Sequence, residues 1–182
     1  MDYRQKLAFS FEHLSDQLKQ YFNLYQGINE KYLSETPLTG KWSILQNLQH
    51  LLRSEQLGLQ YLQFKFIGDQ AIPAVNLRNR FSLIILYVAF NSPFKFKAPE
   101  GKGLDIPENT GNITSLYNDF VETREALFDL ISKIPDEKLA KAWFKHPYAG
   151  RMSLNDMLWF LSFHFKRHHL QILKVLAKTK KV

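Results

Sequence analysis

Four long segments of this chain repeat their apolar residues at intervals of three and four, which is the spacing of one helix face. They predict helices from residue 2 to about 28, from Ser43 to about Phe66, from Asn112 or Thr114 to Ile131 or Lys133, and from Ser153 onward. Strand patterns are nearly absent, and no internal repeat is present. We therefore expect an all-α fold, a four-helix bundle formed by a single domain over residues 1–182.

The connection between the second and third predicted helices is irregular. A short helix is expected from Asn76 to Phe90, after Pro73, and the prolines and glycines of residues 91–110 exclude a regular helix there. A loop of this length is long enough to cover a site as a lid. We expect an irregular insertion with one short helix between helices two and three.

The composition excludes several classes of protein. The chain has no cysteine, which rules out disulfides, thiolate metal sites and a cysteine nucleophile. Its longest apolar run, from Phe81 to Phe90, is too short to span a bilayer, and no signal peptide is apparent at the N-terminus. The net charge of +7 is diffuse. We expect a cytoplasmic protein without a membrane partner. A basic protein that does not bind nucleic acid is favoured over one that does.

The last predicted helix carries His164 and His168 within its apolar stripe, on the row that also holds Leu161, Gln171 and Val175. Two histidines four residues apart stand one turn above each other, so both should point into the bundle and can hold one transition-metal ion. Burying them costs free energy unless their nitrogens bind a metal or accept and donate hydrogen bonds. Both explanations are open, and no glutamate lies between them to make a zinc-protease motif.

The second predicted helix has two different stripes. One is rich in leucine and includes Leu48, Leu52 and Leu59, whereas the other is mostly polar and includes Asn47, His50, Ser54 and Tyr61. Periodicity alone favours His50 as an exposed histidine, since it points away from the leucines. His13, beside the stripe of the first helix, is expected to be an ordinary surface histidine.

Two segments together resemble the DinB-like superfamily. The sequence HPYAGRMSLNDMLWFLSFHFKRHHLQI is similar to the C-terminal signature of that family, through His146-Pro147, Gly150, Ser153, His164, His168 and Gln171. Trp42, Ser43 and His50 match its second-helix element. The resemblance implies a four-helix bundle in which His50, His164 and His168 bind a divalent metal, zinc or nickel. It reverses the interpretation of His50, because the polar stripe would face the metal.

The resemblance also implies a class of function. Characterised relatives include thiol S-transferases and a thiol-dependent isomerase. We therefore expect a metal-dependent thiol S-transferase or hydrolase that acts on a small molecule, with or without a low-molecular-weight thiol as a partner. Gln171 could support the metal ligands, and Ser54 and Tyr61 could line the pocket. The alternative is a non-catalytic helical bundle whose histidines bond to each other or to Glu55.

The leucine stripe of the second helix raises a question of oligomeric state. If His50 faces a metal cleft, then Leu48, Leu52 and Leu59 need another cover. A homodimer interface could provide it, and we therefore expect a homodimer.

Overall fold

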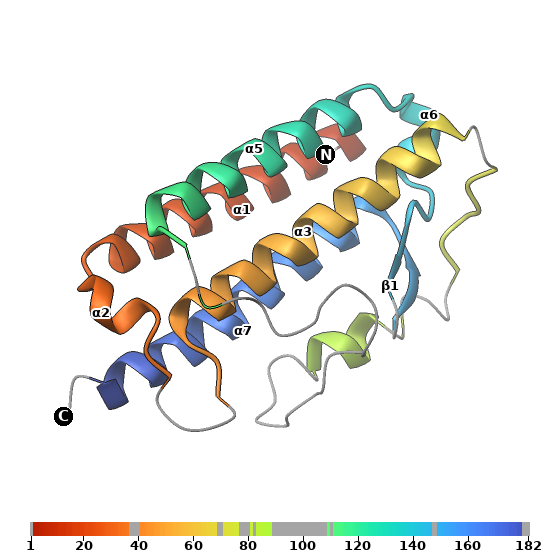
Figure 1. The fold of residues 1–182 in the computed structure, drawn as a ribbon. Coiled ribbons are helices and arrows are strands. Elements are labelled where there is room, and N and C mark those ends of the chain that lie inside the picture. The colour runs from red at the N-terminus through yellow and green to blue at the C-terminus, as the bar shows by residue number, and fades with distance from the viewer. Residues whose placement is uncertain are drawn as a thin grey trace.

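The computed structural model describes residues 2–36, 41–68, 71–76, 81, 83–88, 109, 111–146 and 149–179. Its four long helices are α1 (Tyr3–Gln26), α3 (Ile44–Ile67), α5 (Ile113–Ser132) and α7 (Leu154–Thr179), and they confirm the all-α bundle (Figure 1). The shorter helices are α2 (Glu30–Leu33) and α6 (Asp136–Leu139). Residues 83–88 are helical, within the expected short helix, whereas residues 91–108 and 110 of the expected loop lie outside the described part. No described helix is both long and apolar enough to cross a membrane.

The helices follow one another around the bundle in the order α1, α5, α3, α7, because α1 packs on α5 and α7, and α3 packs on the same two helices. Figure 1 shows that α3 and α5 run in the same direction, and that α1 and α7 run in the opposite one. Two parallel neighbours cannot be joined by a tight turn, so the chain between α3 and α5 has to return along the bundle. This explains why the long insertion falls between these helices.

Capping boxes fix the start of the helices that carry the histidines. The Ser43 hydroxyl accepts a hydrogen bond from the Gln46 N–H at 3.1 Å, and the Gln46 side chain accepts one from the Ser43 N–H at 3.0 Å. Ser153 and Asp156 form the same pair of bonds at the start of α7, both at 3.2 Å. Each box satisfies two backbone groups that a helix end leaves unpaired. The expected helix starts are therefore correct.

The connector before α7 contains a β-hairpin that the sequence did not indicate. Strand β1 (Phe144–His146) pairs antiparallel with β2 (Gly150–Met152), in the register Phe144↔Met152, Lys145↔Arg151 and His146↔Gly150. Gly150 has a φ of 74°, a left-handed conformation that favours glycine. Strands of three residues are too short for their alternation to be recognised, which is why the sequence showed almost no strand pattern.

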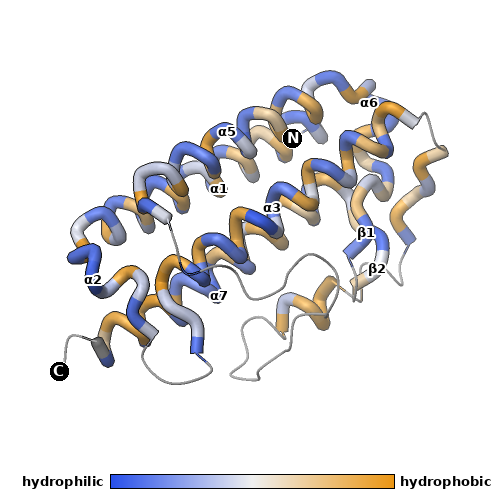
Figure 2. The backbone as a smooth tube through the Cα atoms, viewed as in Figure 1, coloured by the Kyte–Doolittle hydropathy of each residue, from blue (hydrophilic) through white to orange (hydrophobic). Residues whose placement is uncertain are grey.

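The leucine stripe of α3 is buried within the chain. Leu48, Leu52 and Leu59 all belong to the hydrophobic core, in which α3 is packed between α5 and α7. Hydrophobic and hydrophilic residues alternate in short runs along all four long helices (Figure 2), as expected of helices with buried faces. These leucines need no second subunit, so our reason for expecting a homodimer was wrong. The homodimer itself stays a prediction.

A buried ion pair joins α3 and α5. The Arg124 guanidinium of α5 donates to both carboxylate oxygens of Glu55 on α3, at 2.9 and 2.6 Å. It also donates to the Leu14 carbonyl of α1 at 2.6 Å, and its guanidinium carbon lies 5.4 Å from the ring centroid of Phe165 on α7. Arg124 therefore contacts all four long helices.

Removing one partner of this pair should destabilise the bundle strongly. Glu55→Leu leaves the buried Arg124 charge uncompensated, and we expect a loss of about 3–5 kcal/mol in the free energy of unfolding, measured by urea denaturation. The double variant Glu55→Leu/Arg124→Met should be less destabilised than Glu55→Leu alone. Lys133→Met, which breaks an exposed pair with Asp129, is the control and should cost less than about 1 kcal/mol. Equal losses for Glu55→Leu and Lys133→Met would contradict this account.

Candidate metal centre

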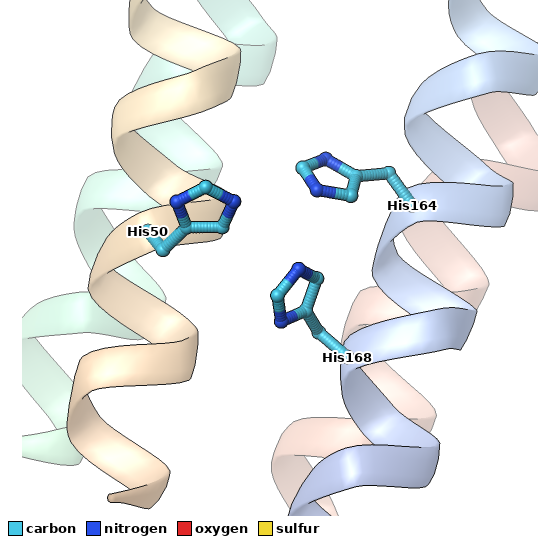
Figure 3. A group of neighbouring side chains, drawn as sticks. All are labelled: His50, His164 and His168. Atoms are coloured by element: carbon cyan, nitrogen blue, oxygen red, sulfur yellow. The ribbon is translucent and has the colours of Figure 1, made fainter. Parts of the chain in front are cut away.

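Three imidazoles meet between α3 and α7. His50 comes from the second turn of α3, and His164 and His168 come from successive turns of α7 (Figure 3). The ring centroid of His50 lies 5.3 Å from that of His164 and 4.9 Å from that of His168. One nitrogen of each ring lies within 4.8 Å of the other two. The structure therefore brings together the three histidines that the resemblance implied, including the one that periodicity placed at the surface.

Burial keeps these rings neutral. His50, His164 and His168 are 5%, 8% and 7% exposed. Burial lowers the pKa of His50 to about 4. Burial, followed by the charges of His50 and Arg167, lowers the pKa of His168 to about 3. The pKa of His164 falls well below its usual range, through burial first and then through the neighbouring His168, His50, His146 and Arg167. At neutral pH all three rings therefore have a lone pair available for a metal ion.

Asn47 sets the tautomer of His168. The Asn47 side-chain N–H donates to the Ser43 carbonyl at 2.8 Å, which turns the amide oxygen toward His168. That oxygen lies 2.8 Å from His168 Nδ1 and can only accept, so Nδ1 carries the proton. The lone pair of His168 is then on Nε2. Asn47 is 2% exposed, and its two hydrogen bonds hold the ring as a metal-bound histidine is usually held.

Aromatic side chains border the cluster. The Trp42 ring lies 4.9 Å from His50 and 6.1 Å from His168, measured between centroids. Phe160 stacks near His164 at 5.5 Å, with an angle of 20° between the rings, and touches His146 edge-on at 4.6 Å. His146 Nδ1 accepts a hydrogen bond from the backbone N–H of Ala149 at 3.1 Å. The hairpin thus places a fourth, buried histidine close to the three that could share an ion.

The other candidate pocket residues have different surroundings. Ser54 and Gln171 are half-buried, each near one turn from a clustered histidine. Tyr61 follows His50 by eleven residues, about 16 Å along the helix, and instead packs edge-on against Phe144 at 5.7 Å. The structure thus leaves Ser54 and Gln171 near the cluster and places Tyr61 away from it.

The two remaining histidines of the chain lie outside the cluster. His13 is exposed beside Trp159, as expected of a surface histidine. His169 points toward α1, where its Nδ1 lies 2.6 Å from the Tyr25 hydroxyl and its ring stacks on Tyr21 at 3.7 Å. These contacts turn His169 away from the three clustered histidines.

The donor set fits a divalent metal ion. Two nitrogens that are each about 2.1 Å from a shared ion are at most about 4.2 Å apart, so small ring rotations suffice to close the observed spacing. Among the residues that the structure describes, the buried Nδ1 of His50 has no hydrogen-bond partner. Burying an unpaired ring nitrogen is costly, and a bond between the ring and an ion would offset that cost. Glu55 pairs with Arg124 instead, so the alternative in which Glu55 holds the histidines is wrong.

Sequence reasoning missed two residues of this centre. Asn47 precedes His50 by three residues on the polar stripe, and that spacing was the signal for a residue sharing its face. His146 was named only as the start of the His-Pro pair in the family signature. Its place beside Phe160 depends on the hairpin, which no local pattern revealed.

The fold and the site define a class: an α-helical bundle in which two helices distant in sequence bury a cluster of three histidines. The sequence model of the DinB superfamily matches residues 13–172, so the chain belongs to that superfamily. No curated protein sequence matches the chain. A solved structure of YfiT from Bacillus subtilis, described as "a probable metal-dependent hydrolase with an unusual four-helix bundle topology", is similar with a TM-score of 0.57. The two are 18% identical over 98% of this chain and 87% of that chain, a similarity that shows the fold.

The metal-free protein should lose stability as the pH falls below the ordinary histidine pKa. The folded pKa values of His50 and His168 lie below the unfolded value of about 6.5, so the unfolded state gains protons first. Between about pH 6.5 and pH 4, His50 and His168 should each lower the free energy of unfolding by on the order of 3 kcal/mol. Chelator-treated protein, unfolded in urea across this range, measures the slope.

His168→Gln should flatten that slope, and the matched variant His13→Gln should leave it unchanged, because His13 is exposed. An identical slope for wild type and His168→Gln would show that the buried rings do not control acid stability.

Proposed function

We propose that this chain is a divalent-metal-dependent enzyme acting on a small molecule, with the ion held by His50, His164 and His168. The convergence of three buried, neutral imidazole nitrogens from two helices carries this proposal. Membership of the DinB superfamily and the description of YfiT support it. Three nitrogen ligands leave positions open for substrate, as in catalytic zinc sites, and imidazole suits both zinc and nickel.

A divalent ion bound there supplies Lewis acidity, which lowers the pKa of water or a thiol and polarises a carbonyl group. The chain's own residues orient and enclose the site. Asn47 keeps the proton of His168 on Nδ1, and Trp42 and Phe160 shield the flanks of the rings from water. The tautomer of His168 is therefore set before a substrate arrives.

Two reactions can use such a centre: hydrolysis, and S-transfer involving a low-molecular-weight thiol. The description of YfiT favours hydrolysis. Because the chain has no cysteine, a thiol would have to be a separate cosubstrate. Assaying metal-loaded protein on an activated ester, with and without added cysteine as the thiol, separates the two, since only transfer requires the thiol.

Purified protein should bind about one zinc or nickel ion per chain, measured by equilibrium dialysis with elemental analysis. His164→Ala should abolish stoichiometric binding, because two ligands cannot hold the ion as firmly as three. His13→Ala removes a histidine outside the cluster and should bind as wild type does. Unchanged binding by His164→Ala, or no stoichiometric binding by wild type, would refute the proposal.

Asn47 should control metal affinity without touching the ion. Asn47→Leu removes the acceptor that fixes His168 and should weaken zinc binding roughly 10- to 100-fold. Asn47→Asp keeps an acceptor oxygen at the same place and should retain affinity. Competition with a chromogenic chelator measures both variants. A loss in Asn47→Asp as large as that in Asn47→Leu would show that Asn47 acts through packing instead.

A further inference from the structure

A cavity of about 230 Å³ lies between α7 and the short helix of residues 83–88. Most of its described wall consists of aromatic and aliphatic side chains: Trp159, Phe160 and Phe163 of α7, and Leu83, Leu86 and Tyr87 of the short helix. Tyr87 packs edge-on against Phe163, with 4.7 Å between the ring centroids. The two helices therefore touch at the wall of the cavity.

The packing of the short helix does not require this cavity. Leu83 and Leu86 pack against the apolar core, which explains why the helix lies on α7. Protein interiors contain few voids larger than a water molecule, so a void of this size is not a usual by-product of packing. Ile84 and Tyr87 line the cavity and are 59% and 47% exposed, so a small molecule can enter it from solvent.

The volume of the cavity restricts the size of an occupant. An apolar cavity of about 150 Å³ holds one benzene molecule. Pockets that bind drug-sized ligands start at about 300 Å³. The observed 230 Å³ lies between these sizes, so it has room for one aromatic ring with a short substituent. It is too small to receive a helix of a partner protein.

The charge at the cavity restricts the chemistry of an occupant. Among the described lining residues only Asp156 is charged, and its carboxylate accepts a hydrogen bond from the Ser153 hydroxyl at 2.7 Å. An anionic ligand would be repelled by this carboxylate in surroundings that screen charge poorly. A neutral apolar group avoids that repulsion and also the cost of removing a charge from water.

We propose that this cavity is a binding site for a neutral aromatic ring carried by a small molecule. The rings of Trp159, Phe160 and Phe163 offer faces and edges against which such a ring can stack or pack edge-on. Binding of the ring depends only on the cavity, so this part of the proposal holds with or without a metal ion in the protein.

Phe160 connects the cavity with the candidate metal centre. It lines the cavity, stacks near His164 at 5.5 Å and touches His146 edge-on at 4.6 Å. Phe160 precedes His164 by one turn of α7, about 6 Å along the helix axis. The ring bound in the cavity therefore belongs to the substrate of the enzyme. This assignment, unlike the binding itself, rests on the proposed function.

Calorimetric titration of the chelator-treated full chain tests the binding, with para-methylbenzamide as a neutral one-ring probe. Wild type should bind it saturably. The anion para-methylbenzoate has nearly the same shape and should bind roughly tenfold more weakly, because it meets the Asp156 carboxylate. Asp156→Asn keeps an acceptor oxygen for the start of α7 and removes the charge, so it should reduce this difference between the two probes. A residue that only supports the fold would not change it.

Filling the cavity should abolish the binding. Leu86→Trp puts a larger side chain into the wall and should weaken para-methylbenzamide binding roughly tenfold or more. Leu24→Trp makes the same change at an exposed position of α1 and should bind as wild type does. A thermal melt shows whether each variant is folded. No saturable binding by wild type, or equal binding by folded Leu86→Trp and wild type, would overturn the proposal.

Two further outcomes would assign the cavity differently. Binding that appears only after zinc is added would place the probe at the metal centre and overturn the proposal. Binding that weakens as the protein concentration rises, with chains associating in sedimentation, would give this face to a second copy of the chain and also overturn it.

The substrate assignment has its own readout. In zinc-loaded protein para-methylbenzamide should inhibit cleavage of the activated ester competitively, and Leu86→Trp should lose this inhibition. Binding of the probe by a protein without zinc affinity would support the cavity and contradict the proposed function. Zinc binding by a protein that does not bind the probe would have the converse meaning.

Discussion

The contacts of Arg124 organise the bundle. One guanidinium joins Glu55 of α3 to the Leu14 carbonyl of α1 and lies over Phe165 of α7. A buried charge is stable only with its partners in place, so this interaction restricts how the helices can rotate. With Glu55 directed at α5, His50 lies five residues earlier and about 140° around the helix, on the side that faces α7. The ion pair on one side of α3 therefore positions the metal-ligand candidate on the other.

Helix α3 is covered on several sides along its middle, and Arg53 and Gln60 are exposed there. Its leucines meet the apolar core, Glu55 meets Arg124, and Asn47 and His50 meet α7. Burying three imidazoles in this position requires that they remain neutral, and burial lowers their pKa values accordingly. The same environment that makes protonation unfavourable leaves the ring nitrogens available to an ion. The packing of the helices that buries the three imidazoles thus also keeps them neutral.

Periodicity and caps predicted the helices because both signals are local: Ser43 and Ser153 begin α3 and α7 as expected. They could not decide which side of α3 would be covered. Treating the leucine stripe as the one buried face made His50 look exposed and led to the wrong reason for a homodimer. The resemblance to a family corrected His50. The Arg124–Glu55 pair, the Asn47 bond to His168 and the hairpin join residues far apart in the chain, and no local pattern encodes them.

Anomalous diffraction from crystals of zinc-loaded protein, collected at the zinc absorption edge, tests the central claim most directly. The account predicts a single strong peak between α3 and α7, bonded to one ring nitrogen each of His50, His164 and His168. For His168 that nitrogen should be Nε2, with Nδ1 still bonded to Asn47. An ion bound elsewhere, with three metal-free imidazoles packed against each other in a folded protein, would contradict it.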